Sequence, residues 1–226
     1  HYKENKIVPW AKSRYPEFEK FFTEHMRKII LLQETKGNQV RYISKNNLNI
    51  ARIGYLSNSF PDSTIIILFR SPLQQASSLL RQHRNFIKIH KKDSFARKYM
   101  EDTGHYDFGE NLRPVDFNGW VSEVDSPNPS KLSFWLAYWI NTYRYQLQNK
   151  NEQVKFFSFD SLCKDPITSL KKLSEIIEVK NVNGLMKNVD QIRIPSPYEV
   201  DTTEISPIIL GRANELYKEL QEDGSN

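Results

Sequence analysis

Cysteine and long apolar runs are nearly missing from this chain of 226 residues. The single cysteine, Cys163, excludes an intrachain disulfide and predicts a reducing, cytoplasmic compartment. No stretch reaches the roughly 20 apolar residues that a helix needs to cross a bilayer, so we predict no membrane segment. The chain begins with His1-Tyr2-Lys3 and shows no signal peptide, and we expect an upstream piece of the domain to be missing.

Glycine-rich loops and metal-ligand clusters are also missing. The chain has 8 glycines, and no Gly-x-x-x-x-Gly-Lys-Ser/Thr run is among them. No His/Cys/Asp cluster has ligand spacing, so we predict no metal. The net charge of +5 is interspersed along the chain without a basic block. This pattern does not predict a nucleic-acid partner, and it suits a small polyanionic ligand.

Helix and strand patterns alternate along the sequence, which predicts an α/β fold with a central parallel sheet flanked by helices. The length favours a single domain over residues 1–226. Helical spacing and turn residues predict six helices besides the one described below: Tyr15–Gln33, Leu48–Asn58, Ser94–Met100, Leu132–Leu147, Pro166–Ile177 and Pro207–Leu220. Strands are predicted at Gln39–Ser44, Ser63–Phe69 and Gln153–Phe159.

Arg70 is the most informative residue, because it follows a short β-branched run and precedes a helix signal. Ser71 can cap that helix and Pro72 suits its first turn. Ser78 lies two turns further along the same face. A guanidinium, a helix N-terminus and a hydroxyl at the carboxyl edge of a sheet suit a phosphate monoester. The alternative is a structural arginine paired with a nearby carboxylate.

The helix at Leu132–Leu147 is rich in aromatic residues. Their helical spacing favours core packing over an acceptor site. The region from Gln82 to Pro129 contains long irregular stretches, which are typical of a functional loop or lid.

Three blocks in order give the chain a family resemblance. It resembles the sulfotransferases that use 3′-phosphoadenosine 5′-phosphosulfate (PAPS), whose signature is a lysine at a strand end, a Phe-Pro turn, Arg-x-Pro with a serine eight residues after the arginine, and a strand followed by Asp-Pro. The matching blocks are Arg41–Asn47 with Phe60-Pro61, Thr64–Ser78, and Trp135–Tyr145 with Val154–Pro166.

The resemblance implies a P-loop-NTPase-like fold and transfer of a sulfuryl group from PAPS to a hydroxyl or amine by in-line displacement. Arg70 and Ser78 would hold the 3′-phosphate of PAPS or of its product, 3′-phosphoadenosine 5′-phosphate (PAP). Phe159 would stack on adenine, with a core position as its alternative. Arg193 would add a second cation, and Lys45 would neutralise charge on the transferring group.

Two parts of the family pattern are missing. The phosphosulfate loop does not precede Lys45, which fits an N-terminally truncated domain or a domain that has lost the loop. Asn47 stands where the cytosolic branch has a histidine base, and an amide cannot take a proton at neutral pH. We name His83 as the candidate base; the further candidates are His90, His105, Asp107 and Glu110.

Two other functions stay open at this point. A kinase of related architecture would need a Walker loop that this sequence does not contain. A non-catalytic binding domain would keep the fold without the phosphosulfate loop. The acceptor could be a small molecule, a carbohydrate, a lipid or a protein tyrosine, and the sequence does not indicate an oligomeric state.

Overall fold

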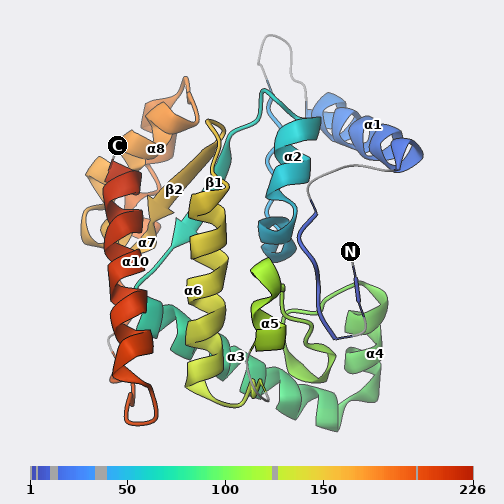
Figure 1. Ribbon diagram of the computed structural model, residues 1–226. Coiled ribbons are helices and arrows are strands. Elements are labelled where there is room, and N and C mark those ends of the chain that lie inside the picture. The colour runs from blue at the N-terminus through green and yellow to red at the C-terminus, as the bar shows by residue number, and fades with distance from the viewer. Residues whose placement is uncertain are drawn as a thin grey trace. The chain divides into compact units, whose positions relative to one another are not determined.

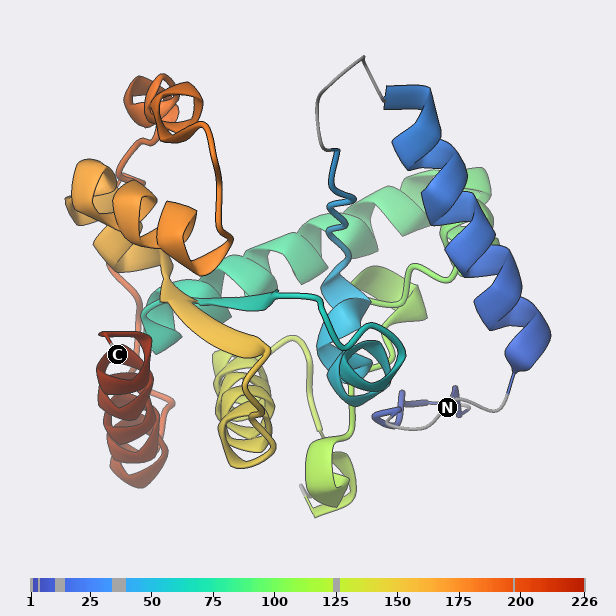
Figure 2. The same ribbon diagram turned by 90° about the horizontal axis from the view of Figure 1, so that it is seen from above.

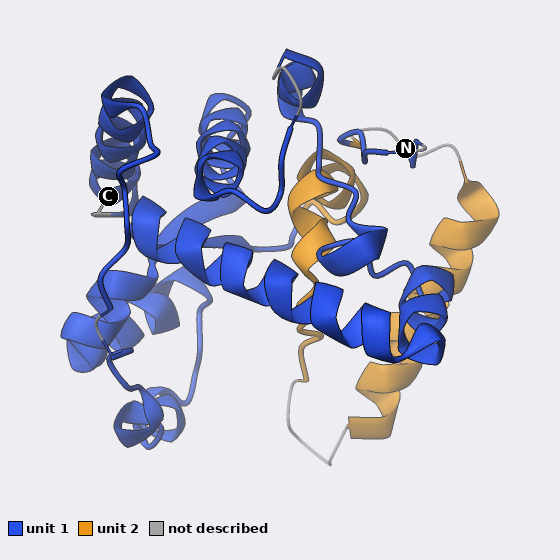
Figure 3. Cartoon of the chain, turned by 90° about the horizontal axis from the view of Figure 1, so that it is seen from below, with its two compact units in different colours: residues 1–9, 62–226 blue, residues 10–61 orange. Residues whose placement is uncertain are grey.

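The computed structural model describes residues 2–3, 5–10, 15–33, 40–123, 127–196 and 198–225. The protein is mixed α/β, mostly helical, with a parallel sheet of two strands. The chain divides into two compact units (Figure 3): unit 1 comprises residues 1–9 and 62–226, and unit 2 comprises residues 10–61. A single domain over residues 1–226 stays a prediction.

The sheet of unit 1 joins β1 (Ile65–Phe69) to β2 (Val154–Ser158). The strands are parallel and in register from Ile65 opposite Val154 to Phe69 opposite Ser158. Because parallel strands point the same way, their carboxyl ends meet at one edge, and the residues that follow them come together there. The predicted parallel arrangement of these two strands is confirmed, and the edge they share positions the candidate site.

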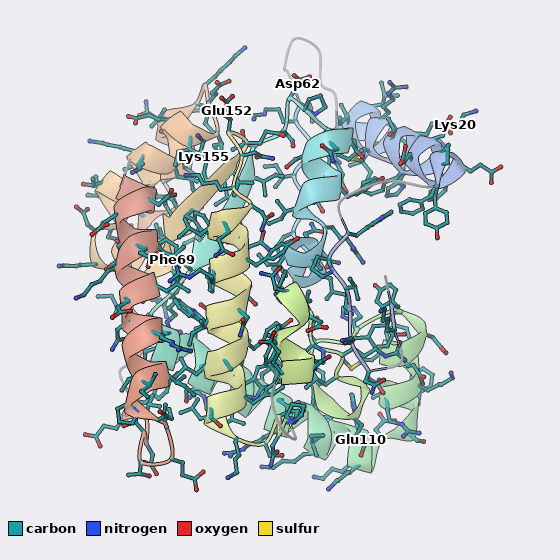
Figure 4. The ribbon with its side chains drawn as sticks, in the orientation of Figure 1. Lys20, Asp62, Phe69, Glu110, Glu152 and Lys155 are labelled. Atoms are coloured by element: carbon teal, nitrogen blue, oxygen red, sulfur yellow. The ribbon has the colours of Figure 1, made fainter. Side chains whose placement is uncertain are left out.

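Two long helices pack beside the sheet in unit 1. α6 (Leu132–Gln148) and α10 (Pro207–Ser225) lie side by side next to the strands (Figures 1 and 2). Trp135, Leu136 and Trp139 of α6 are fully buried, so the aromatic helix forms core as its spacing predicts. Phe69, labelled in Figure 4, is also buried and meets Phe156 and Tyr217 edge-on.

α3 (Pro72–Lys92) is the longest helix, and it runs below the strands in Figure 1. Pro72 occupies its first turn as predicted, where a missing N–H costs nothing. Ala76 and Leu80 are buried and form its apolar face. At its end Asp93 caps the next helix, α4 (Ser94–Asp102), by accepting the N–H of Ala96.

Shorter elements complete unit 1. Asp165 caps α8 by accepting the N–H of Thr168, and Pro166 occupies the first turn, so the Asp-Pro pair begins a helix as predicted. The remaining elements are η2 (Gly109–Asn111), η3 (Phe117–Gly119), α5 (Trp120–Glu123), α7 (Phe159–Lys164), α8 (Pro166–Ile176), α9 (Val182–Met186) and η4 (Val189–Gln191).

Unit 2 contains α1 (Pro16–Gln33), the 3-10 turn η1 (Asn47–Ala51) and α2 (Ile53–Ser59). Trp10 stacks on Tyr55, with ring centroids 4.3 Å apart. The predicted strand at Gln39–Ser44 is wrong over its described residues, 40–44, which form no ladder. Its alternation would need one buried face, but Ile43 is 85% exposed. Gln39 itself lies outside the described residues.

None of the helices in the described ranges combines the length and the apolar character that a membrane span requires.

Candidate active site

The shared edge of the two strands brings Arg70 and Phe159 together. Arg70 follows β1, and Phe159 follows β2 and begins α7. The guanidinium carbon of Arg70 lies 5.4 Å from the centroid of the Phe159 ring, in cation–π geometry. Phe159 is half-buried, so it is not a core aromatic. Its observed partner is a cation, and contact with adenine stays a prediction.

Asp160 connects three elements at this edge. Its Oδ2 accepts the backbone N–H of Ser71 at 2.6 Å and the hydroxyl of Tyr217 at 2.7 Å. Burial raises the pKa of Tyr217, and the neighbouring Asp160 raises it further. Ser71 stands at the N-cap of α3, but its side chain makes no capping bond there. The predicted hydroxyl cap is therefore wrong, because a carboxylate from the other strand end supplies the negative charge.

Arg70 keeps unused hydrogen-bonding capacity beside Asp160. The closest approach joins Arg70 Nε to Asp160 Oδ1 at 3.8 Å, beyond hydrogen-bond distance. The side chain is 21% exposed, while Nε is enclosed and has no acceptor in the part of the chain described. Part of the structural-arginine alternative holds, because a carboxylate is nearby. The ion pair leaves Nε without an acceptor among the described residues, which a purely structural pairing does not require.

The exposed face of α3 continues from Arg70 toward Ser78. Gln74, one turn before Ser78, donates from its side-chain amide to the carbonyl of Tyr198 at 3.2 Å and accepts the Tyr198 hydroxyl at its own carbonyl at 2.8 Å. One turn after Ser78, the Arg81 guanidinium lies 4.2 Å from the Tyr198 ring centroid. The loop that contains Tyr198 therefore runs along the face of α3 that presents Ser78.

Arg193 lies in the same loop. Its carbonyl accepts the thiol of Cys163 at 3.6 Å, and its side chain is exposed. Burial raises the pKa of Cys163, Asp160 raises it further, and Arg70 lowers it, so the thiol lies close to this pair. The structure thus brings Arg70, Phe159 and the backbone of Arg193 to one edge. Where the Arg193 side chain binds stays a prediction.

Lys45 belongs to unit 2 and is exposed. Its ammonium donates to the side chain of Asn47 at 2.7 Å, and Asn46 caps η1 by accepting the N–H of Leu48. Lys45 lies in unit 2 and Arg70 in unit 1, so the predicted role of Lys45 at the transferring group stays a prediction.

His83 lies far along α3 from Arg70. The 13 residues between them correspond to about 20 Å of helix. His83 is buried, and its Nδ1 accepts the N–H of Gly109 at 3.1 Å. Burial lowers the pKa of His83, and Arg84 lowers it further. In the neutral ring the proton then sits on Nε2, so His83 donates there and cannot serve as a base through that atom.

The other candidate bases are also held by local contacts or exposed. His90 is buried and accepts the N–H of Glu110 at 3.2 Å, while the Glu110 carboxylate lies 3.4 Å from Arg97. His105 is exposed, and Asp107 is half-buried. The partners of His90 and Glu110 lie in their own region of the chain, and the identity of the base stays open.

A cavity of about 690 Å³ lies at the histidine end of α3. His83, Lys3, Lys6 and Glu110 contribute polar groups, and the rest of its wall is largely apolar. Lys6 is already engaged with Asp116 and Ser122. A second cavity of about 310 Å³ is lined by Phe69 and Ser158, the neighbours of Arg70 and Phe159 in sequence. Across the described ranges no group of three or more His, Cys, Asp or Glu could hold a metal ion.

Sequence reasoning missed the residues that hold this site in place: Asp160, Tyr217 and Tyr198. Asp160 stands in the block that carries the resemblance, so a carboxylate at the second strand end was a usable signal. Tyr217 and Tyr198 had no local signal, because they reach the site from the last helix and from an irregular loop.

Comparison with known proteins identifies no relative: no family model, no curated protein and no solved structure matches this chain.

Proposed function

We propose that this chain is a sulfotransferase domain that binds PAPS through its 3′-phosphate at Arg70. The observation that supports the proposal best is the unsatisfied guanidinium. A buried N–H without an acceptor costs roughly 1–3 kcal/mol, and a phosphate oxygen offers the acceptor that Asp160 provides only at long range. Phe159 supports the cation from one side, and Ser78 lies two turns along the adjoining helix.

The parts of the site have separate roles on this proposal. Asp160 orients Arg70 and fixes the start of α3, so the phosphate meets an arginine whose position is set in advance. Arg193 adds positive charge from the loop above α7, and Lys45 is proposed to neutralise charge at the transferring group. PAPS supplies an activated sulfuryl group, and the chain supplies positioning and charge stabilisation. The P-loop-NTPase-like architecture of the family is part of the same proposal.

The test is calorimetric titration with PAP, with 5′-AMP as the ligand that lacks the 3′-phosphate. We expect PAP to bind and 5′-AMP to bind at least tenfold more weakly, because a charge-assisted contact is worth about 1.5–3 kcal/mol. Arg70→Ala should lose PAP binding to the same degree, and Arg70→Lys should recover only part of it, because an ammonium lacks the planar fork.

Arg212→Ala is the matched control, because Arg212 is an exposed arginine on α10. It should bind PAP as the unchanged protein does. Equal affinity for PAP in Arg70→Ala and Arg212→Ala would refute the site. Phosphate transfer from ATP without any PAP binding would refute the sulfotransferase proposal and favour a kinase.

A further inference from the structure

The exposed face of α3 carries positive charge without any negative charge. The helix contains five lysines and arginines after Ser78 and no aspartate or glutamate. At 100° per residue these five side chains fall within an arc of about 100°, to one side of the buried Ala76 and His83, and the buried Leu80 borders the arc. The basic face consists of Arg81, Arg84, Lys88, Lys91 and Lys92.

All five residues of the basic face are exposed, and none forms an ion pair with any described residue. Some other surface cations of unit 1 have acidic neighbours: Arg97 lies beside Glu110, and Lys98 lies beside Glu101 and Asp102. Ordinary solvated faces mix both signs, and this one does not. The face therefore suits a partner that brings its own negative charges.

The cations are spaced along a line. Arg81 and Lys92 are separated by about 17 Å of helix, with steps of one to four residues between neighbours. Arg81 is held against the ring of Tyr198, and Arg84 donates to the carbonyl of Ser130 at 2.9 Å. Two of the five are thus oriented before any partner arrives. A linear polymer with repeated negative charges fits this row better than a compact ligand does.

The residues between the cations indicate sugars rather than bases. Asn85 is exposed and lies between Arg84 and Lys88, and Gln74 and Ser78 precede the cations on α3, so amide and hydroxyl groups accompany the positive charges. The one aromatic residue of α3, Phe86, stacks on Phe108 and is not fully exposed. Single-stranded nucleic acids rely on exposed aromatic platforms for their bases, which this face lacks.

We infer that the basic face of α3 binds a linear acidic polysaccharide. The face occupies the second half of α3, and Arg81, its first residue, lies about 16 Å of helix beyond Arg70. On the proposed function, on which this clause rests, the bound polysaccharide extends along the helix toward Arg70, is the acceptor and supplies the hydroxyl. Polysaccharide binding itself does not depend on that function. Figure 3, which views the molecule from below, shows α3 crossing unit 1 along its length.

The test measures binding of a fluorescein-labelled oligosaccharide of unsulfated chondroitin, a carboxylated polymer, by anisotropy. We expect binding that weakens by about tenfold or more between roughly 0.05 and 0.5 M NaCl, because exposed charges are screened. Lys88→Glu/Lys91→Glu should weaken it by at least about tenfold. The control Lys187→Glu/Lys218→Glu changes the net charge equally at exposed lysines outside α3 and should keep most of the affinity.

Three further ligands decide between partners. Neutral dextran should not bind; equal binding of dextran and chondroitin would overturn the inference. Single-stranded RNA tests the nucleic-acid alternative, and vesicles with anionic lipid test the membrane alternative that exposed Phe95 and Tyr99 on α4 raise. Tighter binding of either one than of chondroitin would overturn the inference as well.

PAP titration of the same proteins separates this inference from the proposed function. Chondroitin binding without PAP binding supports the basic face and refutes the donor site. PAP binding without chondroitin binding refutes the basic face alone. We expect Lys88→Glu/Lys91→Glu to bind PAP as the unchanged protein does, because neither lysine is part of the site at Arg70.

Discussion

The two ends of α3 differ in how completely their polar groups are paired. At the beginning, the enclosed Nε of Arg70 has no acceptor among the residues that the structure describes. Toward the end, His83 and His90 each accept a backbone N–H, from Gly109 and Glu110 respectively. Figure 4 labels Phe69 and Glu110, which mark the two ends and lie well apart in unit 1. Paired polar groups stabilise a fold, whereas a buried unpaired one requires an explanation, and the proposed phosphate contact supplies one for Arg70.

At the histidine end of α3, His83 and His90 hold the short η2 segment against the helix. His83 and His90 are seven residues apart, so they lie on the same face of α3 and meet two successive residues of η2. His90 also reaches the sulfur of Met100 at 3.3 Å, and His83 packs on Trp135 with centroids 5.5 Å apart. The sequence predicts both residues as candidate bases, but their contacts are those of structural residues.

The largest expected effect on stability comes from a substitution at Gly109, because there is no room for a side chain at this residue beside His90. A Cβ at this residue would stand 2.6 Å from Cε1 and 2.7 Å from Nδ1 of His90, and its φ of +75° already disfavours a side chain. Gly109→Ala should lower the free energy of unfolding by about 3 kcal/mol or more, through strain and loss of both histidine bonds. Urea denaturation measures it.

Gly104→Ala is the matched control for that substitution. Gly104 has the same φ of +75°, but a Cβ there would meet nothing within 4 Å. It should cost about 1 kcal/mol, which is the backbone contribution alone. Equal losses in the two variants would show that the contact with His90 contributes nothing, and the histidine end would then be no more tightly packed than an open turn.

The second-largest expected effect is at Asp160, and it tests whether this carboxylate stabilises the Arg70 end of α3. Asp160→Ala removes the acceptor of Ser71 N–H and of the Tyr217 hydroxyl and should lower the free energy of unfolding by about 2 kcal/mol. Tyr217→Phe removes only one of these bonds and should cost about half as much. A larger loss in Tyr217→Phe than in Asp160→Ala would contradict the central position of Asp160.

Local sequence signals predicted the elements around the site but not the contacts between them. The run before Arg70, the pair Ser71-Pro72 and the spacing of Ala76 and Leu80 give β1 and α3 directly, because these signals act over a few residues. Asp160 lies 89 residues from Ser71, and no periodicity links the two. The capping carboxylate could therefore be found only once the two strands were paired.

The sequence predictions that the structure overturned were wrong for the same kind of reason, because they depended on neighbours from elsewhere in the chain. The strand predicted at Gln39–Ser44 has suitable residues, but strand structure depends on a partner and a buried face, which the sequence of one segment does not contain. His83 has the residue type of a base, but its Nδ1 is taken by Gly109, 26 residues away. Candidate residue types can thus be read from a sequence, whereas the protonation state of each depends on neighbours brought in by the fold.

The smallest expected effect is on the pH dependence of stability through His83. Its pKa in the folded protein lies below the ordinary value of 6.5, chiefly because of burial, so the unfolded chain binds the proton more readily. Stability is then complete above about pH 6.5 and decreases as the pH falls below that value. We expect the loss from this residue to grow as the pH falls from about 6.5 toward the lowered pKa of the folded state.

His83→Gln separates this titration from packing, because a glutamine oxygen can accept the N–H of Gly109 but cannot take up a proton in this range. The variant should lose less stability than the unchanged protein between about pH 6.5 and 5 in urea denaturation. His105→Gln, at an exposed histidine, should follow the unchanged protein. If His83→Gln kept the full pH dependence, Nδ1 of His83 would not need to be unprotonated in the folded state. His83 would then return as a candidate base, and the contrast between the two ends of α3 would fail.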